Sequence, residues 1–178
     1  MDLLARGFDT ATGAWIEVEG GAEITAVEQP LAPPARGPWL APGFVDIQVN
    51  GYAGADYNDP ACPLEAIGRS LEAQFRAGVT RLFPTVITGP EARITGALRN
   101  LVRARRELPH GGAMEAFHVE GPHISPQDGP RGAHPREHVR PPSKEEFLRW
   151  QEAAEGLVRL VTVSPEWPEA PEYIEFLV

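Results

Sequence analysis

The sequence predicts an α/β protein in which a small β segment precedes a parallel sheet with helices packed on it. Two observations carry this prediction. From residue 44 onward, short apolar strands alternate with amphipathic helices, which is typical of parallel sheets with helical connections. The first forty residues instead form short β-branched runs, and a proline-rich stretch separates the two patterns. We therefore expect a β segment with its linker in residues 1–41 and a βα region in residues 42–178.

The β segment is predicted to contain a hairpin. The runs AWIEVE and EITAVE are rich in β-branched and aromatic residues, and the Gly20-Gly21 pair between them is a turn signal. Prolines then cluster in residues 30–42, which predicts a linker loop between the two regions.

The βα region contains four strand–helix units. In the first strand, GFVDIQVNG, apolar and polar residues alternate, so Gln48 and Asn50 share one face. Ser143 and Glu146 form a capping box that predicts the start of the third helix. Four units, at about 30 residues each, are half of a (β/α)8 barrel, and a doubly wound sheet is the alternative from the pattern alone. The predicted elements are strands at 43–51, 79–88, 114–122 and 158–166, and helices at 64–77, 90–107, 143–154 and 168–178.

The composition argues against several classes of protein. Sixteen Lys and Arg against 25 Asp and Glu give a net charge of -9, which disfavours binding to nucleic acid through a cationic surface. The single cysteine, Cys62, excludes a disulfide framework. The chain has no apolar run near the roughly 20 residues that cross a bilayer, and its start lacks the pattern of a signal peptide. We therefore expect a cytoplasmic protein without nucleic-acid or membrane partners.

Polar side chains at two strand ends suggest a metal site. Gln48 and Asn50 end the first strand, and His118 and Glu120 end the third. The carboxyl ends of parallel strands meet at one edge, and a carboxylate beside a histidine and amides is a plausible divalent-metal site. The alternatives are a carboxylate that caps a backbone N–H or forms a salt bridge, and a hydrogen-bonded interior histidine.

A long loop follows the third strand. Its residues 127–140 include Arg131, Arg136, Arg140 and two histidines. Loops longer than about 12–15 residues are usually functional or disordered. In an acidic protein, such a loop is suited to an anionic group such as phosphate, and the alternative is a solvated lid with scattered charges.

Five motifs occur in order and extend over nearly the whole chain. They are PGFVDIQVNG at 42–51, FPTVIT at 83–88, HVEGP at 118–122, RGAH at 131–134 and VSPE at 163–166. Together they resemble the N-terminal half of the N-acetylglucosamine-6-phosphate deacetylases, in the amidohydrolase superfamily, and the combination of HVEGP with GAH is the specific part. The resemblance implies the N-terminal part, about four βα units, of a (β/α)8 barrel, preceded by a segment of a small β-sandwich.

The resemblance implies one divalent metal ion, zinc or iron. Glu120 matches the family's glutamate ligand. Gln48 and Asn50 stand where many amidohydrolases have a His-x-His pair, which resembles the single-metal branch of the deacetylases. Amides bind a borderline metal less well than imidazoles, so a second metal is disfavoured.

The resemblance also implies a substrate and a reaction. Ala133 and His134 match the loop that contacts the sugar, and His118 matches a supporting residue that lines the site. The implied reaction is metal-dependent hydrolysis of the acetamide of N-acetylglucosamine 6-phosphate to glucosamine 6-phosphate and acetate. A homodimer is implied for the complete enzyme. The choice between glucosamine and galactosamine stays open.

The chain also departs from the family's pattern. The family's other metal-binding histidines and its catalytic aspartate belong to later strands that are not in this sequence. We therefore expect a truncated chain with an incomplete metal site and no catalytic residue, inactive by itself. Two other interpretations are a non-catalytic remnant that binds a sugar phosphate, and another amidohydrolase such as a dihydroorotase. The missing His-x-His pair argues against the second.

Overall fold

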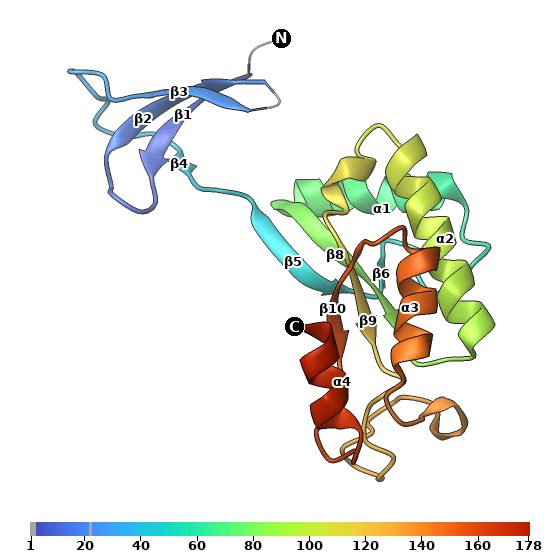
Figure 1. Ribbon diagram of the computed structural model, residues 1–178. Helices are drawn as coiled ribbons and strands as arrows, with labels where there is room; N and C mark the ends of the chain where they lie inside the picture. Colours follow the sequence, from blue (N-terminus) through green and yellow to red (C-terminus); the bar gives the residue numbers. More distant parts are fainter. Residues whose placement is uncertain (1–2, 22) are drawn as a thin grey trace. The chain divides into compact units, whose positions relative to one another are not determined.

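The computed structural model describes residues 3–21 and 23–178 (Figure 1). The chain forms two compact units, residues 1–43 and 44–178, and each is described by itself. The α/β class is confirmed, because a parallel sheet with four α-helices makes up the second unit. None of the helices in the described residues is long and apolar enough to cross a membrane.

The first unit is a four-stranded sheet with the order β3-β2-β1-β4. The predicted hairpin is confirmed, since β2 pairs antiparallel with β3 next to the Gly20-Gly21 pair. The pattern did not predict β1, and the proline-rich linker also contains a short strand, β4, that pairs parallel with β1. The strands are β1 Leu3–Asp9, β2 Trp15–Gly20, β3 Ile24–Glu28 and β4 Trp39–Leu40.

An aromatic cluster holds β4 to this sheet. The ring of Phe8 lies 5.1 Å from that of Trp15 and 5.7 Å from that of Trp39, measured between centroids. Gly37 lies so close to the Trp15 ring that a Cβ atom there would come within 2.3 Å of it. The cluster explains why part of the proline-rich stretch is ordered, because the aromatic rings pack against each other although Trp39 remains 67% exposed.

The second unit is built on a parallel sheet with the order β10-β9-β8-β5. The four predicted strands are present, and two are shorter than expected. A small two-stranded sheet follows β5. The strands are β5 Phe44–Val49, β6 Gly51–Tyr52, β7 Ala55–Asp56, β8 Val79–Ile87, β9 Phe117–Glu120 and β10 Val158–Thr162.

The helices pack along this sheet, with α1 and α3 on either side of α2 (Figure 1). Gly78 ends α1 because it adopts a positive φ of 89°, which favours glycine. Ser143 caps α3 as predicted, since its Oγ accepts a hydrogen bond from the Glu146 N–H. The helices are α1 Leu64–Arg76, α2 Glu91–Glu107, α3 Lys144–Ala153 and α4 Ala170–Leu177, with 3-10 turns η1 Gly111–Ala113 and η2 Arg136–His138.

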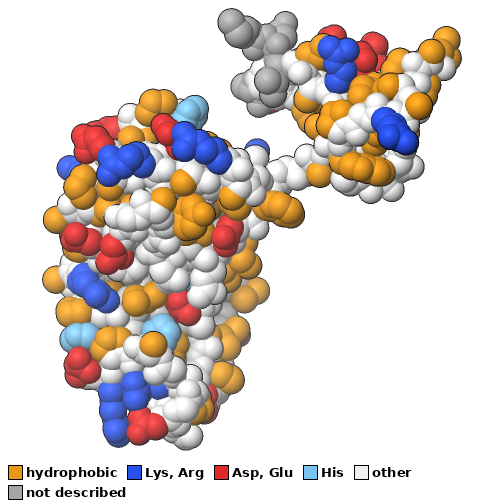
Figure 2. Space-filling model, turned by 180° about the vertical axis from the view of Figure 1, so that it is seen from behind, with side chains coloured by type: hydrophobic (Ala, Val, Ile, Leu, Met, Phe, Trp, Pro, Cys, Tyr) orange, Lys and Arg blue, Asp and Glu red, His pale blue; other side chains and the backbone are white. Residues whose placement is uncertain are grey.

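The hydrophobic core lies between the sheet and these helices. Leu82 and Val86 of β8 are fully buried, as are Ile67 of α1 and Leu98 of α2. Trp150 of α3 is the largest fully buried side chain. On the face of the second unit seen in Figure 2, acidic and basic side chains are interspersed rather than gathered by sign.

A buried histidine joins the loop after β9 to two helices. The His123 ring stacks on Trp150 with 5.2 Å between centroids, and it meets the Tyr173 ring edge-on at 5.3 Å. Its Nδ1 lies 3.2 Å from the Arg140 carbonyl oxygen, to which it donates. Burial lowers the pKa of His123 below its usual value, because the charged imidazolium is poorly solvated there.

This lowered pKa predicts that the second unit loses stability in mild acid. Above the unfolded-state pKa, near 6.5, both states are neutral and stability is complete. As the pH falls below that value, the histidine of the unfolded chain takes up a proton. His123 in the folded protein stays neutral until the pH reaches its own, lower pKa. The free energy of unfolding then falls by about 1.4 kcal/mol for each unit between the two pKa values.

The change His123→Phe keeps the aromatic contacts and should flatten this pH dependence between about pH 7.5 and 5. Urea unfolding across this range measures it. The matched control is His110→Phe, because His110 is exposed. An unchanged slope in the His123 variant would contradict the assignment.

Candidate functional site

Five of the six predicted site residues line one shallow pocket at the carboxyl end of the parallel sheet. The pocket has a volume of about 230 Å³. Gln48 and Asn50 reach it from the end of β5, and Glu120 from the end of β9. Ala133 and His134 reach it from the loop after β9. The structure thus brings together five predicted residues that are up to 86 positions apart in the sequence.

Glu120 is the centre of the polar contacts in this pocket. Its Oε2 accepts a hydrogen bond from Asn50 Nδ2 at 3.3 Å, and its Oε1 lies 3.8 Å from His134 Nε2. The Glu120 side chain is 21% exposed, so it can still contact a ligand that enters the pocket. A partly buried carboxylate with an amide donor on one oxygen is held in one orientation and keeps acceptor sites free.

The His134 ring is held on its Nδ1 side by Thr88, the residue that follows β8. Its Nδ1 lies 2.8 Å from Thr88 Oγ1, and its carbonyl oxygen accepts a hydrogen bond from Arg131 at 2.7 Å. The ring therefore points Nε2 toward Glu120 and the pocket. Thr88 was not predicted from the sequence, because a threonine at a strand end carries no distinctive pattern.

The turn after Glu120 requires a glycine. Gly121 has a φ of 82°, and a Cβ atom there would lie 2.1 Å from Thr88 Oγ1. The Thr88 N–H also donates to the Glu120 carbonyl oxygen at 3.1 Å. The glycine in the HVEGP motif therefore permits the close approach that puts Thr88 between Glu120 and His134.

His118 lies beneath the pocket and does not line it. It is 3% exposed, with Nε2 2.8 Å from Thr162 Oγ1 and Nδ1 3.4 Å from Thr85 Oγ1. Burial lowers the pKa of His118, while the nearby Glu120 carboxylate acts in the opposite direction. This geometry is that of a hydrogen-bonded interior histidine, which was the alternative interpretation of its sequence position.

Asn58 is a second residue that the sequence analysis missed. It is buried, its Oδ1 accepts from the Ile87 N–H at 2.6 Å, and its Nδ2 donates to the Asn50 carbonyl at 3.2 Å. Asn58 therefore joins the ends of β8 and β5. It lies in the loop before α1, where an asparagine looks like an ordinary turn residue.

Two of the three loop arginines have side-chain partners, Arg131 within the loop and Arg140 also outside it. Arg131 bonds to Asp128 and to the His134 carbonyl, and Arg140 pairs with Glu146. These contacts stabilise the loop itself. They favour an ordered loop over a solvated lid with scattered charges, and they leave Arg136 as the loop arginine that is exposed.

The described residues do not form a complete metal site. In the ranges 3–21 and 23–178, no group of three or more His, Cys, Asp or Glu side chains is placed to hold a metal ion. Glu120 and His134 form only a pair, and catalytic zinc sites in general use three protein ligands. A metal at this pocket would need further ligands from outside these residues.

Comparison with known proteins relates the chain to one group of enzymes. The chain is 34% identical to the N-acetylglucosamine-6-phosphate deacetylase of Bacillus subtilis over 142 residues, which is 78% of this chain and 35% of the relative. It is 35% identical to an N-acetylgalactosamine-6-phosphate deacetylase of Shewanella sp. over 139 residues, 78% of this chain and 34% of that protein. The chain is a homologue of the N-acetylglucosamine-6-phosphate deacetylases.

Solved structures agree with this relationship to the deacetylases. A variant of the Mycobacterium smegmatis deacetylase, in complex with N-acetyl-D-glucosamine-6-phosphate, superposes with a TM-score of 0.79 at 26% identity. The match covers 97% of this chain and 46% of that one. The chain thus spans less than half of the relatives that it matches. A scan against protein-family models finds no match.

The contact between His134 and Thr88 can be tested directly. We expect Thr88→Val to free the His134 ring, at a cost of about 1 kcal/mol for the lost hydrogen bond. Imidazole ¹⁵N NMR of the chain measures this as a changed shift and a more mobile ring for His134. Thr95→Val is the matched control, because the Thr95 hydroxyl donates to Glu91 within α2. Identical His134 signals in the two variants would contradict the assignment.

Proposed function

We propose that this chain provides the first half of an N-acetylhexosamine-6-phosphate deacetylase, an enzyme that releases acetate from the acetamide of its sugar phosphate. The observation that carries the proposal is the meeting of Asn50, Glu120 and His134 in one pocket at the carboxyl ends of parallel strands. Active sites of (β/α)8 barrels lie at this end of the sheet. The homology to deacetylases of both amino sugars supports the reaction and leaves the sugar open.

In this proposal, four further βα units close the sheet into a (β/α)8 barrel, and residues 1–41 belong to a β-sandwich beside it. The outer strand β5 has an exposed apolar side, and an open groove of about 440 Å³ lies beside β10. Parallel sheets in stable proteins have both faces covered. The exposed apolar residues of β5 and the open groove beside β10 therefore favour further βα units next to these two outer strands.

Each residue of the pocket has a role in the proposed reaction. Glu120 is a metal ligand, and Asn50 fixes its orientation through the bond to Oε2. His134, with its Nδ1 held at Thr88, directs Nε2 toward the sugar, and Ala133 lines the same wall. A divalent metal ion, zinc or iron, would polarise the acetamide, but its site needs ligands beyond this chain. We therefore place no catalytic step on this chain alone.

The proposal is tested by joining the chain to the carboxy-terminal remainder of the Bacillus subtilis relative. Acetate release is measured with N-acetylglucosamine 6-phosphate and with N-acetylgalactosamine 6-phosphate. We expect activity from the joined protein and none from the chain alone. A folded chimera that releases no acetate from either sugar would overturn the proposal. Binding of either sugar phosphate to the chain alone would then favour a non-catalytic binding module.

In the active chimera, Glu120→Gln should lower kcat/KM by a factor of about 100 or more, because an amide is a much weaker metal ligand. Metal content by mass spectrometry should fall with it. Glu115→Gln is the matched control, since Glu115 lies just before β9 begins, away from the pocket, and forms an exposed pair with Arg81. Unchanged turnover and metal content in the Glu120 variant would remove this residue from the metal site.

His134→Ala in the same chimera should act mainly on substrate binding. We expect KM to rise about tenfold, equivalent to roughly 1.4 kcal/mol, with a smaller change in kcat. His138→Ala is the control, because His138 belongs to the same loop and does not line the pocket. An unaltered KM in the His134 variant would exclude it from the substrate site.

A further inference from the structure

The loop that carries His134 is closed at its base. It runs from Gly121, directly after β9, to Arg140, shortly before α3. The Arg140 N–H donates to the Pro122 carbonyl oxygen at 3.2 Å, and the Arg140 carbonyl accepts from His123 Nδ1 at 3.2 Å. Two hydrogen bonds thus join the first residues of the loop to its last one.

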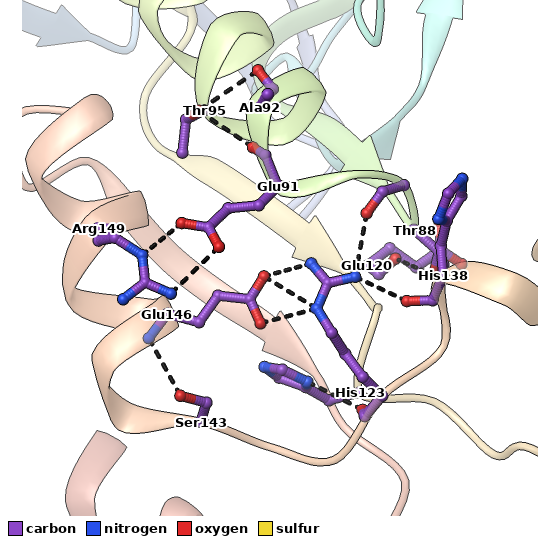
Figure 3. A network of polar contacts seen from close by, with 12 residues as sticks. Thr88, Glu91, Ala92, Thr95, Glu120, His123, His138, Ser143, Glu146 and Arg149 are labelled. Atoms are coloured by element: carbon purple, nitrogen blue, oxygen red, sulfur yellow. Dashed lines mark hydrogen bonds and ion pairs between the residues drawn. The ribbon is translucent and has the colours of Figure 1, made fainter.

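The Arg140 side chain extends this closure to the rest of the fold, through Glu146 and the His138 carbonyl, both labelled residues in Figure 3. Its guanidinium pairs with both oxygens of Glu146 on α3, and Glu146 is only 3% exposed. Its Nη1 donates to the Gly89 carbonyl at 3.1 Å and to the His138 carbonyl at 2.7 Å. A single guanidinium therefore connects the loop, α3 and the turn after β8.

This connection reaches the candidate site in a few steps. Gly89 follows Thr88, whose hydroxyl lies 2.8 Å from His134 Nδ1. The Thr88 carbonyl is itself fixed by Arg93 at 2.8 Å. The Arg140 side chain thus connects the base of the loop to the turn beside Thr88. His134 depends on both, because it belongs to the loop and its ring contacts Thr88.

We propose that Arg140 and Glu146 are positioning residues, and that their buried ion pair holds the loop so that His134 faces Glu120. Neither side chain lines the pocket, so both act through the loop. The role of His134 toward substrate rests on the proposed function. The positioning of His134 by Arg140 does not, and it can be measured without substrate.

A double variant can separate a positioning role of this ion pair from a contribution to the stability of the fold alone. Removing one partner leaves an unpaired buried charge, which is strongly destabilising. Replacing both partners by apolar side chains of similar size is often neutral for stability. The double change Arg140→Met with Glu146→Met therefore keeps the fold while it removes the guanidinium contacts with Gly89 and His138.

The experiment compares this double variant with the unchanged chain, using NMR on the protein alone. We expect amide exchange in residues 123–139 to become at least about tenfold faster, with shifted His134 ring signals, while α2 and β8 keep their protection. Arg149→Met with Glu91→Met is the matched control. It removes a neighbouring ion pair that also involves α3 but is half exposed (Figure 3), and it should leave the loop unchanged.

Loop exchange and His134 signals equal to those of the unchanged chain, in a folded double variant, would overturn the proposal. If the double variant does not fold, Arg140→Lys decides, because a lysine keeps the charge but cannot reach three acceptors at fixed angles. Arg140→Lys should then show faster loop exchange with an intact core, and normal exchange would again overturn the proposal. Failure of the chimera to release acetate would leave these results unaffected.

Discussion

The parallel pairing of β9 with β8 is the constraint on which the candidate site depends. Its register sets His118 opposite Thr85 and Glu120 opposite Ile87. β5 pairs with the other side of β8, so the ends of three strands reach one edge of the sheet. Because side chains alternate along a strand, a slip of one residue would turn Glu120 away from Asn50. Leu82 and Val86 of β8 are fully buried, so a slip of one residue by β8 would also turn these apolar side chains out of the core.

Neutral hydrogen-bonding groups fix the strand ends more than charges do. Thr85 Oγ1 accepts from the Val49 N–H at 3.0 Å, and Asn58 bonds to both β5 and β8 at their ends. Buried groups of this kind each contribute about 1 kcal/mol when paired and cost more when left unpaired. Among the described residues that line the pocket, Glu120 is the carboxylate, and none is a lysine or an arginine. Glu120 therefore keeps the acceptor capacity that a metal ion or a polar ligand needs.

The sequence predicts the strands and helices of the second unit well, because each has a clear period and a clear boundary signal. Gly78 and Ser143 are examples, since each acts through its own local backbone. Glu146 shows the limit of such reasoning. The capping box predicts a local contact with Ser143, whereas its carboxylate pairs with Arg140, and only the folded loop creates that partner.

The same limit holds for the candidate site: local patterns predict some of its residues, and contacts between distant elements are not predicted. Gln48, Asn50 and Glu120 could be found because alternation and strand ends predict where they point. Thr88 and Asn58 could not, because their partners come from elements that are distant in the sequence. The strand β4 was missed for a similar reason, since the aromatic cluster that orders it is a tertiary contact.

The two outer strands of the sheet link the fold to the chemistry. Phe44, Val45 and Ile47 of β5 are 71%, 56% and 53% exposed, whereas Leu82 and Val86 of β8 are fully buried. All five are large apolar residues of one sheet, so position rather than composition makes the difference. Fully burying an exposed large apolar side chain contributes about 1.5–3 kcal/mol, and these three, already partly buried, would gain a fraction of that. Further βα units beside the outer strands would gain this energy. The carboxyl ends of their strands would lie at the same end of the sheet as Glu120. In the proposed complete enzyme, the same added units would therefore bury these side chains and supply further metal ligands to the pocket.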